Sequence, residues 1–213
     1  MAIVSEAIAD YAEAHTSPPS PLLTELAEET QRTLRVPAML SGHVEGRLLE
    51  LLVFAAGARR VLELGTYSGY SSLSMAAGLP PDGRIDTCEV DPANAEVARR
   101  YIARSPYADR ITVHLGPALD TIAALEGEFD LVFIDADKVN YRNYYETVMP
   151  RLSARGLIAV DNTLWGGGVL EEGDTDGETR AIIEFNDYVR HDPRVRCVLL
   201  TVRDGITLVR RND

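Results

Sequence analysis

The 213-residue chain has few of the features that mark secreted, membrane-bound or nucleic-acid-binding proteins. Its two cysteines are too few for a disulfide framework, which favours a reducing compartment and predicts a cytoplasmic protein. No apolar run approaches the roughly 18 residues of a membrane span, and the N-terminus lacks the basic-then-apolar order of a signal peptide. A net charge of −12 offers no general attraction to nucleic acid or an anionic bilayer. We therefore expect neither a nucleic-acid partner nor a membrane partner.

Lysine is almost absent, because the 21 basic residues are 20 arginines and one lysine, Lys138. The ordinary interpretation of a lysine is a solvated surface residue. This one closes the acidic segment FIDADK, residues 133–138. A lysine beside a divalent cation can give up its proton and act as a general base, whereas arginine stays protonated. Lys138 is therefore a candidate catalytic residue.

After residue 57, short apolar runs alternate with helical patterns, which predicts an α/β fold with a mostly parallel sheet. Candidate strands cover residues 60–64, 84–90, 111–115, 131–135, 157–160, 195–201 and 206–210. Candidate helices cover residues 70–78, 92–104, 117–125, 140–153 and 178–191. A short Arg-Asp-Gly turn separates the last two strands, so we expect the final strand to be antiparallel to its neighbour.

Residues 1–57 are predicted to form helices, the first of which ends at the proline-rich segment 17–21. A third helix, over about residues 43–56, is expected to face the sheet. Its predicted apolar stripe consists of Val44, Leu48, Leu51, Leu52 and Ala55. No repeat or linker interrupts the chain. We therefore expect one domain over residues 1–213, with a helical extension (1–57) before an α/β core (58–213).

The segment VLELGTYSGYSS, residues 61–72, has the strand-turn-helix pattern of a ligand site at the carboxyl end of a strand. Tyr67 stands where a dinucleotide fingerprint needs its second glycine, and the chain has no Gly-Lys-Ser/Thr of a phosphate-binding loop. The turn therefore suits a nucleoside without phosphates, and Glu63 could accept a hydrogen bond from an amine. A tight turn that binds nothing is the alternative.

Glu89 ends the next predicted strand, about 20 residues after the glycine turn, where an acidic residue commonly binds both ribose hydroxyls. Asp91 is interpreted as the N-cap of the helix that begins at Pro92. Cys88 and Cys197 are expected in strand cores. The glycine turn and the acidic residue Glu89 together favour a nucleoside cofactor.

Two further strand ends carry oxygen ligands. Asp135 lies in FIDADK, and Asp161 and Asn162 lie in AVDNT, residues 159–163. No His or Cys is nearby, so the set suits Mg²⁺, Mn²⁺ or Ca²⁺ better than zinc or copper. Single strand-end aspartates more often cap helices and turns. Two such ends on one edge of the sheet favour a metal site.

The order of these motifs over about residues 36–211 resembles the cation-dependent O-methyltransferases, which include catechol O-methyltransferase and the plant caffeoyl-CoA O-methyltransferases. The matching segments are VLELGTYSGYSS, TCEVDP, GPALDTI, FDLVFIDADKVNYRNYYE, GLIAVDNTLWGGGV and DGITLVRR. The resemblance implies a Rossmann-like S-adenosylmethionine-dependent fold with strand order 3-2-1-4-5-7-6 and strand 7 antiparallel. It also implies a homodimer.

The resemblance assigns roles position by position. Lys138 matches the catalytic lysine and, with Trp165, borders the acceptor. The matches to metal ligands are Asp135, Asp161 and Asn162. The matches to S-adenosylmethionine contacts are Ser41, Glu63, Gly65, Thr66, Ser71, Glu89, Ala118, Asp135 and Asp137.

The expected function is therefore methylation of one hydroxyl of a catechol-type small molecule, dependent on S-adenosylmethionine and a divalent cation. A caffeoyl-CoA-type acceptor is disfavoured, because residues 1–31 contain six acids and no Lys or Arg, and the loop 166–178 is also acidic. An NAD-dependent oxidoreductase and a non-catalytic S-adenosylmethionine-binding domain are the alternatives from other classes.

Overall fold

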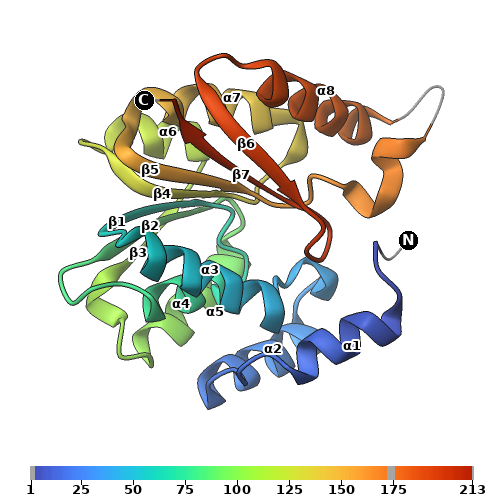
Figure 1. The fold of residues 1–213 in the computed structure, drawn as a ribbon. Coiled ribbons are helices and arrows are strands. Elements are labelled where there is room, and N and C mark those ends of the chain that lie inside the picture. The colour runs from blue at the N-terminus through green and yellow to red at the C-terminus, as the bar shows by residue number, and fades with distance from the viewer. Residues whose placement is uncertain (1–2, 172–175, 213) are drawn as a thin grey trace.

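The computed structural model describes residues 3–171 and 176–212, which form one seven-stranded sheet with helices on both faces (Figure 1). The strands are β1 (Arg60–Leu64), β2 (Arg84–Glu89), β3 (Ile111–Leu115), β4 (Phe129–Ile134), β5 (Leu152–Val160), β6 (Val195–Leu200) and β7 (Ile206–Arg211). The α-helices are α1 (Glu6–Ala14), α2 (Pro21–Thr33), α3 (His43–Ala56), α4 (Tyr70–Ala77), α5 (Pro92–Ala103), α6 (Ala118–Ala124), α7 (Tyr141–Val148) and α8 (Gly177–His191). The 3₁₀ helices are η1 (Pro37–Met39), η2 (Ala108–Arg110), η3 (Lys138–Asn140), η4 (Met149–Arg151) and η5 (Trp165–Leu170). None of the helices in the described ranges combines the length and hydropathy that a bilayer crossing requires.

The strand order β3-β2-β1-β4-β5-β7-β6 confirms the predicted topology. Strands β1 to β5 pair in parallel, and β7 is antiparallel to both β5 and β6. The order reverses between β1 and β4, and the loops after β1, β2, β4 and β5 therefore meet at one edge. Open α/β sheets bind ligands at this edge, beside the point of reversal.

Alternate residues of the central strands pack against opposite layers of helices. In β4, Val132 and Ile134 belong to the core beneath α6, α7 and α8, whereas Leu131 and Phe133 belong to the core shared with α3, α4 and α5 (Figure 1). All four side chains are fully buried. Both faces of the sheet are thus covered, which explains the apolar run of residues 131–134.

The segment between α7 and β5 differs from the prediction. The helix expected to reach residue 153 ends at Val148, and the strand expected from residue 157 begins at Leu152. Pro150 ends the helix, since proline lacks a backbone donor and clashes with the preceding turn. The beginning of β5 includes two exposed residues, so it lacks the apolar run that identified the rest. All other predicted boundaries of the core lie within two residues of those observed.

Three predictions of burial are wrong. Leu51 and Ala55, both expected in the apolar stripe of α3, are exposed, Leu51 to 56%, because the helix is rotated about its axis relative to the prediction. The buried residues of α3 are Glu45, Gly46, Leu49 and Val53. Cys197 is exposed, since β6 is an edge strand, whereas Cys88 is buried as predicted. The rotation of α3 brings a carboxylate, Glu45, into the interior.

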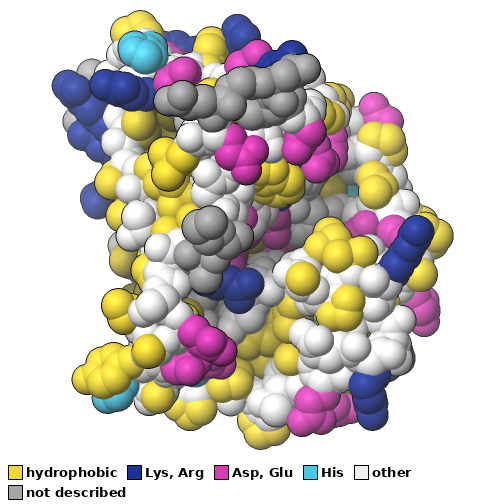
Figure 2. Space-filling view, turned by 90° about the vertical axis from the view of Figure 1, so that its right-hand side faces the viewer, with side chains coloured by type: hydrophobic (Ala, Val, Ile, Leu, Met, Phe, Trp, Pro, Cys, Tyr) yellow, Lys and Arg dark blue, Asp and Glu magenta, His cyan; other side chains and the backbone are white. Residues whose placement is uncertain are grey.

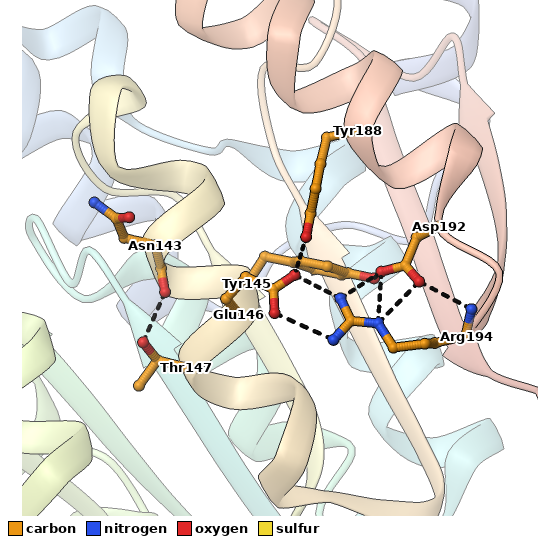
Figure 3. Close-up of polar contacts among 7 residues, drawn as sticks. All are labelled: Asn143, Tyr145, Glu146, Thr147, Tyr188, Asp192 and Arg194. Carbon is orange, nitrogen blue, oxygen red and sulfur yellow. Dashed lines mark hydrogen bonds and ion pairs between the residues drawn. The ribbon is translucent and has the colours of Figure 1, made fainter.

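A polar network joins α7, α8 and the beginning of β6 (Figure 3). Arg194 donates to Glu146 on α7 and to Asp192 after α8, with Nη2–oxygen distances of 2.5 and 2.6 Å. Tyr145 donates to Asp192 at 2.9 Å, and Tyr188 donates to Glu146 at 2.5 Å. Hydrogen bonding from Arg194 lowers the pKa of Asp192 to about 2. The network fixes α7, which directly follows η3, against α8.

Candidate active site

A cavity of about 680 Å³ opens at the carboxyl edge of the sheet. Figure 2 shows this face hollowed, with acidic side chains around the hollow. A second cavity, of about 380 Å³, lies between α2, α3 and α4 and contains none of the predicted site residues. The larger cavity is lined by ten of them: Ser41, Gly65, Glu89, Ala118, Asp135, Asp137, Lys138, Asp161, Asn162 and Trp165.

Three predicted cofactor residues, Glu63 in β1, Thr66 in the turn after it and Ser71 in α4, are buried and do not line this cavity. Glu63 is fully buried, and its Oε2 accepts hydrogen bonds from Ser72 and, at 2.6 Å, from Thr87. Burial raises the pKa of Glu63 to about 7. The Thr66 hydroxyl lies 2.5 Å from that of Thr87. In this structure Glu63 and Thr66 form hydrogen bonds that connect β1 and its turn to β2 and α4.

The turn itself is built around one glycine and one carboxylate. Gly65 has a φ of +102°, and a Cβ there would lie 2.1 Å from the carbonyl oxygen of Asp135, so no other residue fits. The N–H of Tyr67 donates to Glu89 Oε2 at 2.7 Å. The next two backbone N–H groups after Glu89 donate to its Oε1 at 3.0 and 2.8 Å. Glu89 is thus held in one orientation at the cavity wall.

Lys138 is 8% exposed and joins the two acidic motifs. Its Nζ donates to Asp135 Oδ1 at 3.0 Å, to Asn162 Oδ1 at 2.6 Å and to the Tyr141 hydroxyl at 2.6 Å. The Tyr141 hydroxyl donates to the backbone oxygen of Asp161 at 3.1 Å. The ends of β4 and β5 therefore meet at one amine.

Burial changes the ionisation of both carboxyl groups near this amine. Burial raises the pKa of Asp135, against the opposing effect of the Lys138 ammonium. Burial and the charge of Asp135 raise the pKa of Asp161 to about 7. Asp161 Oδ1 is buried without a hydrogen-bond partner among the described residues. Such an oxygen is costly unless a proton or a cation reaches it.

This donor set fits a hard divalent cation, because Asp135, Asp161 and Asn162 offer only oxygen ligands. Within the described ranges, no three His, Cys, Asp or Glu side chains are grouped to hold a metal ion. Asp135 and Asp161 provide two ligands, and the amide oxygen of Asn162 is needed as the third. That oxygen and one of Asp135 are the same atoms that now accept from Lys138.

The backbone around the cavity is unusually strained. In the described part of the chain, four residues other than glycine have positive φ: Tyr67 (48°), Asn162 (56°), Trp165 (49°) and Arg203 (48°). All four line the larger cavity. Such conformations persist only where the surroundings over-determine them, and they cluster at functional sites. The strain therefore points to this cavity as the functional one.

A family model described as O-methyltransferase matches residues 13–212. The chain belongs to this O-methyltransferase family. Tricin synthase 2 from Oryza sativa subsp. japonica is 40% identical over 81% of the chain and 63% of its own length. Caffeoyl-CoA O-methyltransferase 1 from Eucalyptus globulus is 36% identical over 78% of the chain and 72% of its own length. The resemblance inferred from the motifs is confirmed.

Among solved structures, an O-methyltransferase from Bacillus cereus in complex with SAH superposes with a TM-score of 0.89. It is 31% identical, and the match covers 97% of both chains. The chain spans less than two thirds of the rice relative's length.

Sequence reasoning missed one side of the methyltransferase site, which α3 and the β6–β7 turn contribute. Arg203, in that turn, donates to the backbone oxygens of Leu40 (3.3 Å) and Ser41. Its Nε lies 3.4 Å from Oε2 of the buried Glu45. Asp204 accepts from Asn162 Nδ2 at 3.4 Å. The hairpin was interpreted only as a turn, although an antiparallel β7 must begin at the ligand edge of the sheet.

Side chains near Lys138 complete the wall of the methyltransferase cavity. Asp137 accepts from the Tyr144 hydroxyl and, at 2.5 Å, from Asn140 Nδ2. The ring centroid of Trp165 lies 5.8 Å from the Lys138 Nζ. An aromatic surface and a basic group therefore border the same cavity.

Proposed function

We propose that this methyltransferase transfers the methyl group of S-adenosylmethionine to one hydroxyl of a catechol-type acceptor, with Mg²⁺, Mn²⁺ or Ca²⁺ in the site. The observation that carries the proposal is the cluster in which the buried Lys138 donates to Asp135 and Asn162 beside Asp161, whose Oδ1 has no hydrogen-bond partner among the described residues. The related Bacillus cereus enzyme holds SAH, which is S-adenosylmethionine after loss of its methyl group.

The cavity offers contacts for each part of this cofactor. Glu89, held by three backbone donors, presents its carboxylate to the two ribose hydroxyls. Ala118, at the beginning of α6, leaves room for the adenine, and Ser41 and Gly65 border the methionine part. Asp137 carries negative charge on the same wall, which favours a sulfonium cation. Glu63, Thr66 and Ser71 are buried and act indirectly, by fixing the turn.

The chemistry follows from the residues at the strand ends. Asp135, Asp161 and Asn162 would hold the cation, which supplies Lewis-acid catalysis that makes the acceptor hydroxyl more acidic. The neutral amine of Lys138, which a bound cation would favour, can receive the hydroxyl proton at its Nζ. The oxygen–methyl bond then forms as the sulfur–methyl bond breaks, and the sulfonium becomes a neutral thioether. Trp165 holds the aromatic ring, so that the two reactants meet at short distance.

A caffeoyl-CoA-type acceptor is the second candidate, because the Eucalyptus globulus relative carries that name at 36% identity. Charge argues against it. Among the described residues that line the cavity, only Lys138 and Arg203 are basic. The acidic lining residues are Glu45, Glu89, Asp135, Asp137, Asp161 and Glu178. The phosphates of a CoA ester would be repelled by this wall, whereas a compact catechol carries no such charge. Membership of the O-methyltransferase family excludes the alternative function of an NAD-dependent oxidoreductase.

A methyl-transfer assay with a panel of acceptors tests the proposal. S-adenosylmethionine and the enzyme are incubated with a catechol, its monohydroxylated analogue and caffeoyl-CoA, and methylated products are measured by mass spectrometry. We expect rapid methylation of the catechol alone. Preference for caffeoyl-CoA would select the second candidate. No transfer to any phenolic acceptor would contradict both and favour a non-catalytic domain.

A further inference from the structure

Glu45 is a buried acidic residue to which neither the sequence motifs nor the mechanism assigns a role. It lies in the first turn of α3 and is 1% exposed, yet it borders the larger cavity. Its Oε2 lies 3.4 Å from Arg203, whereas its Oε1 has no hydrogen-bond partner among the described residues. A buried carboxylate with an unsatisfied oxygen costs free energy unless positive charge is close.

The charges nearest to Glu45 make that cost larger. Burial raises the pKa of Glu45 well above its usual range, and the negative charges of Asp161 and Asp135 raise it further. Asp161 also has a buried oxygen without a partner. Two unsatisfied carboxylate oxygens, contributed by α3 and by the end of β5, therefore border the same cavity.

Arg203 does not balance this charge fully. Its guanidinium side chain is 41% exposed, so solvent screens it. Two of its nitrogens donate to the backbone oxygens of Leu40 and Ser41, which leaves Nε for Glu45. The Lys138 ammonium donates to Asp135 and does not contact Glu45. Neither cation therefore satisfies the two unpartnered oxygens, Glu45 Oε1 and Asp161 Oδ1, which a divalent cation nearby would stabilise in their charged form.

We propose that Glu45 is a positioning residue of the divalent-cation site, which acts through Asp161 and strengthens cation binding by its negative charge. The inference rests on the proposed function. Glu45 is placed outside the direct ligands for two reasons. The described acidic side chains do not converge in threes on one point, and Arg203 already occupies one of its oxygens. Partners of metal ligands commonly change metal affinity by roughly 10–100-fold when they are mutated.

Equilibrium binding of Mn²⁺ to the purified enzyme, without cofactor or acceptor, tests this role. We expect Glu45→Gln, which keeps the shape and removes the charge, to raise the Mn²⁺ Kd by roughly 10–100-fold. Glu45→Asp keeps the charge and should recover part of the affinity. The matched control is Glu50→Gln on the same helix, whose carboxylate pairs with Arg47 away from the larger cavity and whose Mn²⁺ Kd should stay at the wild-type value.

Two parallel measurements separate this role from a structural one. Affinity for S-adenosylmethionine without metal and the Tm are measured for every variant. An unchanged Mn²⁺ Kd in Glu45→Gln overturns the inference, whatever happens to the Tm. A loss of S-adenosylmethionine affinity without a loss of Mn²⁺ affinity also overturns it, because Glu45 would then serve the cofactor. If the wild type binds no Mn²⁺, the cation part of the proposed function fails, and this inference fails with it.

Arg203→Gln provides a second test, in which the Mn²⁺ Kd should change in the opposite direction. This test does not depend on the folding of the Glu45 variants. It removes the positive charge 3.4 Å from Glu45 and leaves the acidic residues in place. We expect the Mn²⁺ Kd to fall several-fold, since less positive charge opposes the cation. A Kd equal to or weaker than that of the wild type contradicts a role of Glu45 in cation binding.

Discussion

Replacement of the single lysine by arginine separates proton transfer from charge. Lys138→Arg keeps a positive charge beside Asp135 and Asn162, and a guanidinium can donate to both of their oxygens. The variant cannot, however, release a proton near neutral pH. If Lys138 served only to hold these side chains, turnover should change little.

The proposed mechanism predicts that kcat of Lys138→Arg falls by roughly 10²–10⁴-fold, the usual range for general acid–base catalysis. This corresponds to about 2.7–5.4 kcal/mol of lost transition-state stabilisation. Because Lys138 is 8% exposed, the bulkier guanidinium must be accommodated in a packed site. Affinity for S-adenosylmethionine and the Tm are therefore measured beside kcat, and the cofactor affinity should change little.

The assay compares an unactivated catechol with catechols that carry electron-withdrawing groups. The loss should shrink along this series, because more acidic hydroxyls ionise with less help from a base. Arg142→Lys is a matched control, since Arg142 lies over the Tyr188 ring and outside the larger cavity. Turnover of Lys138→Arg near the wild-type rate on the unactivated catechol would refute the role of the lysine as base.

Four further outcomes are expected. A monohydroxylated acceptor should react at least tenfold more slowly than its 1,2-diol analogue in steady-state kinetics, and equal rates would contradict chelation as the basis of recognition. Gly65→Ala should abolish cofactor binding or folding, seen by calorimetry, because its Cβ would meet the Asp135 carbonyl at 2.1 Å. Arg194→Met should lower the free energy of unfolding at pH 7 by about 1–3 kcal/mol in urea denaturation. Because Asp192 has a lowered folded-state pKa of about 2, its stabilising contribution is present above about pH 4 and is lost as the pH falls towards 2. The difference in unfolding free energy between wild type and Arg194→Met should therefore shrink over that range. The implied homodimer predicts about twice the 23.4 kDa chain mass in light scattering, and a monomer at micromolar concentration would contradict it.

Local patterns predict most of the fold. Residues 131–134 form an apolar strand because helices cover both faces of the sheet, and the short turn before β7 dictates its antiparallel direction. The beginning of β5 was not predictable in this way, because two exposed residues interrupt its apolar pattern. The rotation of α3 depends on which of its faces meets the sheet, and two apolar faces were available in its sequence.

The candidate site likewise contains residues that the sequence predicted and residues that it did not. Asp135, Lys138 and Asn162 were predictable because parallel strands end at one edge, which brings their motifs together. Glu45 and Arg203 were not, since the segment around Ser41 and the β6–β7 turn are 162 residues apart and meet only in the folded chain. No period of hydrophobic residues marks such a contact.

The measurement that tests the central claim most directly is methyl transfer to a catechol after removal of metal ions and after their return. The enzyme is treated with EDTA, its metal content is checked by mass spectrometry, and turnover is measured before and after addition of Mg²⁺ or Mn²⁺. We predict loss of turnover with retained circular dichroism and retained binding of S-adenosylmethionine, followed by recovery on addition of the cation. Full turnover by verified metal-free enzyme in excess EDTA would contradict the account.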